Sequence, residues 1–166
     1  MKIRIENATL VMADGCRKCD LEITDERISS IGRSLEGTAP DRIIDATGRY
    51  LLAGFIDVHS NGIAGFDFTN GWFRHPDFSQ SEVDYCNGLE QAAQAYAACG
   101  VTRVLLTSLA APLEKLRNAL RWYASWRDSE RSTYVAKNVP AGIYIEGTFI
   151  KEESFRGAHN SAYFNQ

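Results

Sequence analysis

The chain has 166 residues, of which 45% are hydrophobic and 23% are charged, a composition typical of a folded protein with one sizeable core. Its formal net charge of −3 argues against nucleic acid or an anionic membrane as the main partner. No apolar run approaches the roughly 20 residues of a membrane span, and residues 1–6 alternate like a strand rather than a signal peptide, so we expect a cytoplasmic protein.

The first fifty residues have the pattern of short strands separated by tight turns. Apolar residues at every second position predict strands near residues 3–12, 21–23, 28–31 and 43–44. The dipeptides Asp14-Gly15, Asp25-Glu26 and Thr47-Gly48 are typical of turns. This segment is therefore predicted to form hairpins or a meander.

Cys16 and Cys19 form a C-x-x-C pair beside the first of these turns. Such a pair can indicate zinc or redox chemistry. No second pair is present to complete a structural zinc site, and a redox pair is expected to open a helix. We interpret both residues as ordinary reduced thiols in or beside a turn.

The pattern changes near residue 50. The nearly continuous apolar run at 51–59 predicts a strand buried on both faces, and a glycine-rich loop follows at 61–78. Ser79 and Glu82 indicate the capping box of a helix that runs to about Cys99 and stops at Gly100. The expected inner face of this helix is Val83, Leu89, Ala93 and Tyr96.

The rest of the chain repeats this alternation. Residues 101–109 predict a second buried strand, Pro112 begins a second helix, and residues 142–146 predict a third strand. Strands that alternate with helices indicate a parallel sheet, either doubly wound or closed into an eight-stranded barrel. A barrel takes about 250 residues, so this chain cannot complete one.

Polar residues follow the first and third of these strands. Asp57, His59 and Asn61 end the first strand, Glu146 ends the third, and His159 lies beyond it. A carboxylate and imidazoles that meet at one edge of a sheet could bind a divalent metal such as zinc or iron. Spacing alone leaves other roles open, because Glu146 could cap a helix, His59 could be a core residue and His159 could face solvent. His75 lies in a polar loop and receives no role.

Several motifs resemble a known family. The sequences IDATG at 44–48 and LAGFIDVH at 52–59 resemble the entry to the barrel of amidohydrolase-superfamily enzymes. The sequences YIEGTFI at 144–150 and GAHN at 157–160 are similar to the H-x-E-G-P-F and G-A-H-N segments of N-acetylglucosamine-6-phosphate deacetylases. The loop at 61–68 also resembles that family, and these matches follow one another in order along the whole chain.

The resemblance implies an α/β fold. Residues 1–50 would be a small β-sandwich-type N-terminal domain, contributing part of a composite sandwich. Residues 51–166 would be the first three strands of an incomplete (β/α)8 TIM barrel.

The resemblance also implies roles for individual residues. Glu146 matches the ligand of one divalent metal ion, zinc or iron, and Ala158 and His159 match contacts to an amino-sugar phosphate substrate. His59 and Asn61 occupy the place of the superfamily's His-x-His pair. Asparagine is a poor zinc ligand, so His59 is expected as a further ligand or as a support for the metal, and Asn61 as a substrate contact.

The activity that the resemblance implies belongs to a longer protein. Two further metal-binding histidines and the catalytic aspartate are expected beyond residue 166, so this chain is expected to contain no catalytic residue and to be inactive alone. The full-length enzyme would hydrolyse the acetamide of N-acetylglucosamine 6-phosphate to glucosamine 6-phosphate and acetate, as a homodimer. Thr148 and Ala53 stand where the family usually has proline, which weakens the substrate assignment more than the fold.

Two other interpretations remain open. The chain could belong to another amidohydrolase, dihydroorotase-like or dipeptidase-like. It could also be a non-enzymatic small α/β domain that binds a ligand or partner. If it is a fragment, unpaired parallel strands with apolar faces predict self-association in solution.

Overall fold

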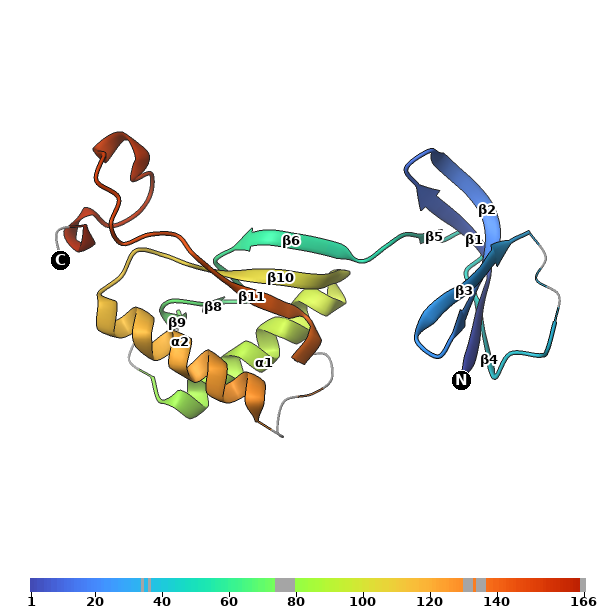
Figure 1. Ribbon diagram of the computed structural model, residues 1–166, viewed down its shortest axis with the longest axis horizontal. Coiled ribbons are helices and arrows are strands. Elements are labelled where there is room, and N and C mark those ends of the chain that lie inside the picture. The colour runs from blue at the N-terminus through green and yellow to red at the C-terminus, as the bar shows by residue number, and fades with distance from the viewer. Residues whose placement is uncertain (34, 36, 74–79, 130–132, 134–136, 165–166) are drawn as a thin grey trace. The chain divides into compact units, whose positions relative to one another are not determined.

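The computed structural model describes residues 1–166 except 34, 36, 74–79, 130–132, 134–136 and 165–166. The protein consists of two compact units, Met1–Ala53 and Gly54–Gln166. Within the described residues, three sheets and two long helices make it a mixed α/β protein, which confirms the α/β part of the prediction (Figure 1). Among the described residues, no helix is both long enough and apolar enough to cross a membrane.

The first unit contains one mixed sheet. Its strands are β1 (Lys2–Met12), β2 (Gly15–Thr24), β3 (Arg27–Gly32), β4 (Arg42–Asp45) and β5 (Tyr50–Leu51). The order is β3-β2-β1-β4, and β5 also pairs with β1. The two hairpins are antiparallel as predicted, but β4 and β5 run parallel to β1, so a simple meander is wrong.

A bulge in β1 allows both of the late strands to pair with it. The register shifts between Ile5 and Ala8, where Asn7 adopts a left-handed conformation with φ of 61°. Residues before the bulge pair with β4, and residues after it pair with β5. The turn at Asp25-Glu26 has positive φ at both residues, as expected of a tight hairpin turn.

The four cysteines are free thiols. Cys16 and Cys19 both lie in β2, where Cys16 is exposed and Cys19 is buried against Leu10 and Leu21. Residues three apart in a strand point to opposite faces, so the pair does not converge on a common ligand.

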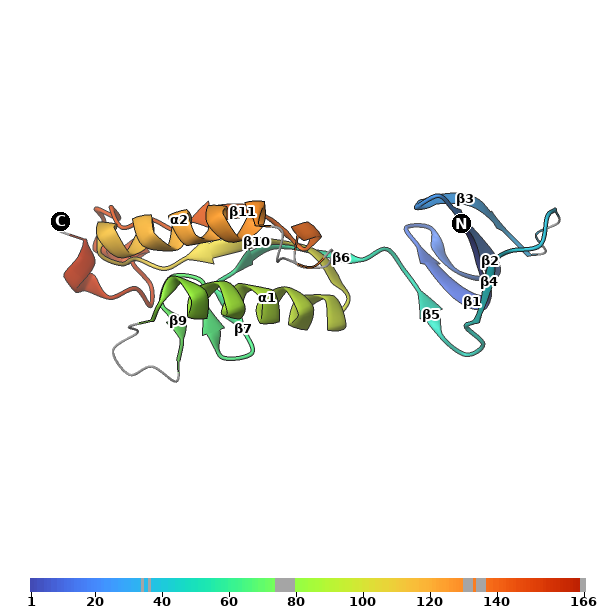
Figure 2. The ribbon, with the colours of Figure 1, turned by 90° about the horizontal axis from the view of Figure 1, so that it is seen from below.

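The second unit is built on three parallel strands. β6 (Phe55–Ser60), β10 (Val101–Ser108) and β11 (Pro140–Ile145) form a sheet in the order β11-β10-β6, as the predicted alternation of strands and helices requires. The helices α1 (Glu82–Ala98) and α2 (Leu113–Asp128) cover one face of this sheet (Figures 1 and 2). Two short 3-10 turns, Glu153–Phe155 and Ser161–Tyr163, follow β11.

Part of the segment predicted as a loop is a small antiparallel sheet. It consists of β7 (Gly62–Ile63), β8 (Phe66–Asp67) and β9 (Gly71–Trp72). Phe66 is 1% exposed and contacts the rings of Trp72 and Tyr85, which extends the hydrophobic core from the helices to this sheet.

The start of α1 differs from its prediction. Ser79 lies outside the described residues, and the capping box in the structure joins Ser81 and Asp84. Leu89, Ala93 and Tyr96 are buried as predicted, whereas Val83 is 62% exposed, because it lies in the first turn of the helix on the side facing away from the core. Gly100 ends the helix in a left-handed conformation, as predicted.

The prediction that the first barrel-like strand is buried on both faces is wrong for this chain. In β6, Phe55, Ile56 and Val58 are 55%, 70% and 63% exposed. β6 is an edge strand, and among the described residues the helices cover only one face of the sheet. The apolar run also divides, because Leu51 pairs with β1 in the first unit and β6 begins at Phe55.

Candidate active site

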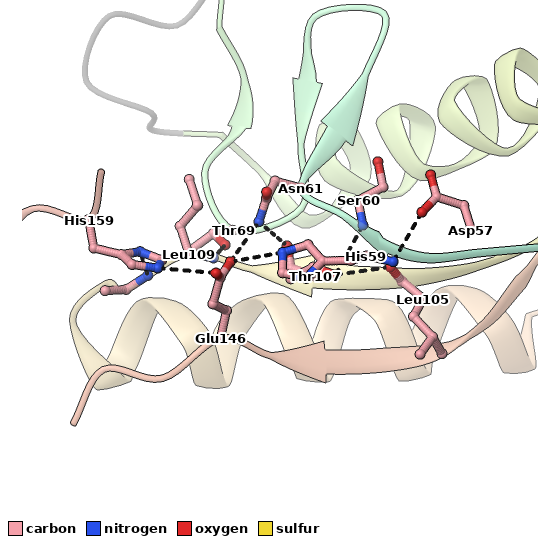
Figure 3. Close-up of polar contacts among 11 residues, drawn as sticks. Asp57, His59, Ser60, Asn61, Thr69, Leu105, Thr107, Leu109, Glu146 and His159 are labelled. Carbon is pink, nitrogen blue, oxygen red and sulfur yellow. Dashed lines mark hydrogen bonds and ion pairs between the residues drawn. The ribbon is translucent and has the colours of Figure 1, made fainter. Parts of the chain in front are cut away.

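The candidate site lies at the carboxyl edge of the parallel sheet. His59 and Ser60 end β6, Asn61 follows them, and Glu146 is the first residue after β11. Because parallel strands end at the same edge, these residues from distant parts of the sequence meet there (Figure 3).

Glu146 is at the centre of the cluster. Its Oε2 lies 3.2 Å from His59 Nε2 and accepts a hydrogen bond of 3.4 Å from Asn61 Nδ2. Its Oε1 lies 3.4 Å from His159 Nε2. Both carboxylate oxygens are therefore in contact with nitrogen atoms that can carry protons.

These contacts affect the charge of Glu146. Partial burial raises the pKa of its carboxyl group, but the Asn61 hydrogen bond and the two nearby imidazole rings outweigh that effect. The pKa consequently lies below its ordinary value of 4.5, and the group is a carboxylate at neutral pH.

Asn61 is fixed by two acceptors. Its Nδ2 also donates a 3.2 Å hydrogen bond to the carbonyl oxygen of Thr107 in β10. The amide nitrogen therefore points at Glu146 and the strand, and Asn61 acts as a donor to the carboxylate.

His59 is held from two sides. Its backbone N–H donates to Asp57 Oδ1 at 3.0 Å, and its ring lies 5.4 Å from the ring of Tyr144. The Asp57 carboxylate therefore shapes the end of β6 and makes no described contact with Glu146. The side chain of His59 stays 47% exposed, so part of it is open to solvent.

The segment after β11 returns to the end of β10. Three successive backbone N–H groups there, those of Leu109, Ala110 and Ala111, donate to Thr69 Oγ1 at 2.7 Å, His159 Nδ1 at 3.2 Å and Thr148 Oγ1 at 3.5 Å. These three hydrogen bonds join the small sheet (through Thr69) and the segment after β11 (through Thr148 and His159) to the end of β10. They also place His159 beside Glu146.

Ala158 is exposed and presents no polar group of its own beyond its backbone. It precedes His159 in the sequence. His75 lies outside the described residues.

Thr107 and Thr69 are site residues that the sequence motifs did not single out. Thr107 is fully buried, and its Oγ1 accepts from Ser60 N at 3.1 Å and donates to Leu105 O at 3.2 Å. It thereby fixes the backbone that carries His59 and Asn61. A hydroxyl directly after the apolar run at 104–106 of a predicted buried strand was the signal that could have found it.

The described side chains of this cluster do not form a metal site as they stand. Carboxylate and imidazole are ligand types that zinc accepts, and Glu146 and His59 fit that role. Their nitrogen and oxygen atoms nevertheless face one another. Among the residues that the structure describes, no group of three or more His, Cys, Asp or Glu side chains is arranged to hold an ion.

Comparison with known proteins relates the chain to two kinds of hydrolase. No family model matches the sequence. The D-hydantoinase of Ralstonia pickettii is 51% identical over 61 residues, which are 37% of this chain and 13% of that protein.

The fold resembles that of deacetylases. The crystal structure of N-acetylglucosamine-6-phosphate deacetylase from Pasteurella multocida matches 99% of this chain and 38% of its own with a TM-score of 0.72 and 23% identity. The Thermotoga maritima deacetylase matches 97% of this chain and 36% of its own, with a TM-score of 0.64 and 23% identity. The chain thus spans only part of the length of each relative.

These similarities confirm the resemblance recognised in the motifs. The chain has the fold of part of an N-acetylglucosamine-6-phosphate deacetylase, and the hydantoinase match indicates the amidohydrolase superfamily.

Proposed function

We propose that this chain supplies part of the active site of a metal-dependent amidohydrolase, an enzyme that adds water across an amide. The observation that carries the proposal is the Glu146 carboxylate, in contact with His59, Asn61 and His159 at the carboxyl edge of a parallel sheet. Sites at this edge are typical of α/β enzymes.

The proposed substrate is N-acetylglucosamine 6-phosphate. Hydrolysis of its acetamide would give acetate and glucosamine 6-phosphate. Two findings support this choice: the similarity of fold to the deacetylases, and the motifs at 144–150 and 157–160. Ala158, His159 and Asn61 are proposed to face this substrate.

The proposed architecture is the first part of an eight-stranded barrel. β6, β10 and β11 would be its first three strands, and the exposed side of these strands would face the barrel interior. The first unit would contribute to a sandwich with other strands. The parallel order supports this arrangement, as does the fact that the described helices lie on one face of the sheet (Figure 2).

Glu146 and His59 would hold one divalent ion, zinc or iron. A bound ion of this kind lowers the pKa of water and polarises the carbonyl of the amide. Zinc sites generally need three protein ligands and water, so the activity is proposed for a longer protein that includes this chain. That protein is proposed to be a cytoplasmic homodimer.

A second candidate is hydrolysis of a cyclic amide. The 51% identity over 61 residues to a D-hydantoinase favours it, because that match is much closer in sequence than the deacetylase matches are. In both reactions water attacks an amide carbonyl. Hydrolysis of a cyclic amide gives one ring-opened product, whereas deacetylation gives two products.

An assay of paired substrates tests the proposal. The longer protein should release acetate from N-acetylglucosamine 6-phosphate and leave hydantoin and dihydrouracil unchanged. Glu146→Gln should lower turnover at least 100-fold, on the order of the loss caused by removing a transition-state contact. The 166-residue chain alone should show no turnover.

Each part of the proposal can fail separately. Ring opening without acetate release would favour the cyclic amide. Turnover by the 166-residue chain at a similar rate would overturn the claim that it is inactive alone. Absence of both activities in a folded, zinc-loaded longer protein would favour a binding role.

A further inference from the structure

Ser60 lies in the sequence between the two residues at the end of β6 that contact Glu146. His59 Nε2 and Asn61 Nδ2 lie 3.2 Å and 3.4 Å from the carboxylate oxygen Oε2 (Figure 3). Because side chains alternate along an extended chain, Ser60 points to the opposite face of the sheet, which the helices cover (Figure 2). A contact of Ser60 on that face therefore affects the position of both neighbours.

Tyr96 of α1 makes this contact. Its hydroxyl lies within hydrogen-bond distance of Ser60 Oγ and donates to the carbonyl oxygen of Gly62 at 3.2 Å. Ser60 Oγ also lies 3.5 Å from that carbonyl oxygen, so the three oxygens form one connected group. The helix thereby holds the chain on both sides of Asn61.

The two ends of this contact are fixed by different parts of the fold. Tyr96 is 4% exposed in the hydrophobic core, and its ring stacks on the ring of Phe68 with 6.4 Å between centroids. A closely packed ring presents its hydroxyl in one position. The backbone N–H of Ser60 donates to Thr107 Oγ1 at 3.1 Å, so Ser60 is held by β10 through its backbone and by α1 through its side chain.

We propose that Tyr96 is a positioning residue of the candidate site. Its hydroxyl acts through Ser60 and fixes the backbone there, which keeps His59 and Asn61 beside the carboxylate of Glu146. The value of this geometry for hydrolysis rests on the proposed function. The contacts themselves need neither a metal nor a substrate.

Tyr85 provides a matched control on the same helix. It is 2% exposed, and its hydroxyl donates to the carbonyl oxygen of Phe68 at 2.6 Å. Tyr85→Phe and Tyr96→Phe each remove one buried hydroxyl that binds a backbone carbonyl group, so both should lower the melting temperature by similar amounts. Only Tyr96→Phe removes a contact with Ser60.

Exchange of the Asn61 side-chain amide protons with water tests the proposal in the metal-free chain. NMR measures this exchange, and Asn61→Asp identifies the signals. In the wild type the two hydrogen bonds of the amide protect its protons. Tyr96→Phe and Ser60→Ala should each speed the exchange roughly 3–10-fold, as expected when one hydrogen bond is weakened, whereas Tyr85→Phe should leave it unchanged.

The double variant Ser60→Ala/Tyr96→Phe tests whether the two hydroxyls act together. If they do, its increase in exchange rate falls well short of the product of the two single increases. An increase equal to that product would show that the two groups act independently, and this would overturn the proposal.

Two other results would also overturn it. Unchanged exchange at Asn61 in Tyr96→Phe would leave Tyr96 as a core residue alone, and an equal increase in Tyr85→Phe would show a general loss of stability. If Tyr96→Phe does not fold, Ser60→Ala decides, because Ser60 is only partly buried. Exchange in Ser60→Ala at the wild-type rate then refutes the proposal.

Kinetics of the longer protein separate this inference from the proposed function. Tyr96→Phe should lower kcat/KM for acetate release at least roughly 10-fold, because small displacements near a reacting centre are costly, and Tyr85→Phe should leave it unchanged. An active longer protein with the same kcat/KM in Tyr96→Phe overturns the positioning role. If the wild type hydrolyses neither kind of amide, the proposed function fails, and the exchange measurement still decides the role of Tyr96.

Discussion

Two carboxylates in this protein, Glu146 and Glu22, are stabilised in their charged form by the groups around them. Glu146 is held by nitrogen donors at the sheet edge, and Glu22 is held in the first unit by two cations. Lys2 Nζ lies 3.0 Å from Glu22 Oε1, and Arg4 Nη2 lies 3.0 Å from Oε2. Glu22 is 7% exposed, so its charge depends on these partners.

The Glu22 contacts make the stability of the first unit depend on pH. The hydrogen bond from Lys2 lowers the pKa of Glu22, burial opposes that effect, and Arg4 lowers it again, so the folded pKa lies below the ordinary 4.5. The folded state then binds fewer protons than the unfolded state. The stabilisation is present above about pH 4.5 and is lost as pH falls through the folded pKa.

Thermal unfolding from neutral pH to below pH 4 measures this effect. Glu22→Gln should lower the melting temperature at neutral pH and reduce the loss of stability on acidification. Asp14→Asn is the control, because its ion pair with Arg17 joins two exposed side chains and contributes little. Parallel pH profiles for Glu22→Gln and the wild type would refute the role of the two cations.

At the scale of elements, the site depends on how closely α1 approaches the small sheet. Gly88 lies in the buried face of α1, and the ring of Phe66 from β8 occupies the space that a side chain at this position would fill. The same core cluster contains Tyr85, Leu89 and Tyr96 of α1. Tyr96 in turn donates to Gly62 O at 3.2 Å and contacts Ser60 Oγ, next to the candidate site.

Gly88→Ala should destabilise the second unit. Alanine improves helix propensity by about 1 kcal/mol, but overpacking a buried site costs about 1–3 kcal/mol, and Phe66 is 1% exposed and cannot move aside. The expected net loss is about 1–2 kcal/mol in chemical denaturation. Gly142→Ala should change little, because its added carbon meets only Leu105 Cδ2 at 3.5 Å. Greater stability of Gly88→Ala would show that the helix can shift.

Local sequence patterns predicted the positions of the long strands and helices well, and predicted the short strands and the helix cap poorly. The apolar periodicity predicted the positions of β10, β11 and α2 within a few residues, because the pattern of apolar side chains in each segment depends on that element alone. The small sheet β7–β9 was missed, because strands of two residues have no periodicity to detect. The cap at Ser81 was misplaced, because the sequence offers two serines two residues apart.

For the molecule as a whole, the second unit presents a sheet face without a cover among its described residues. Ile56, Val58 and Tyr144 are each at least 46% exposed. Parallel sheets normally have both faces covered. Exposed apolar surface of this kind favours association.

We expect the 166-residue chain to self-associate as its concentration rises. Sedimentation velocity should show a mass that increases with concentration, and Ile56→Lys should reduce it, because a charge would have to be buried on association. Asn87→Lys, on the exposed side of α1, adds the same charge elsewhere and should have no effect. A monomer at all concentrations, unchanged by either substitution, would contradict this expectation.

The sequence by itself determined the α/β class, the order of strands and helices, and the residues on which the resemblance to deacetylases rests. These depend on local periodicity, glycine and proline positions, and short motifs such as YIEGTFI and GAHN. Only the tertiary structure decided that Asn61 and His159 both lie beside Glu146, that Asn61 also donates to the carbonyl oxygen of Thr107, and that Ala110 N–H donates to His159. The hydrogen bonds among them join residues 46–85 positions apart, and no local pattern in the sequence encodes which groups meet across such separations.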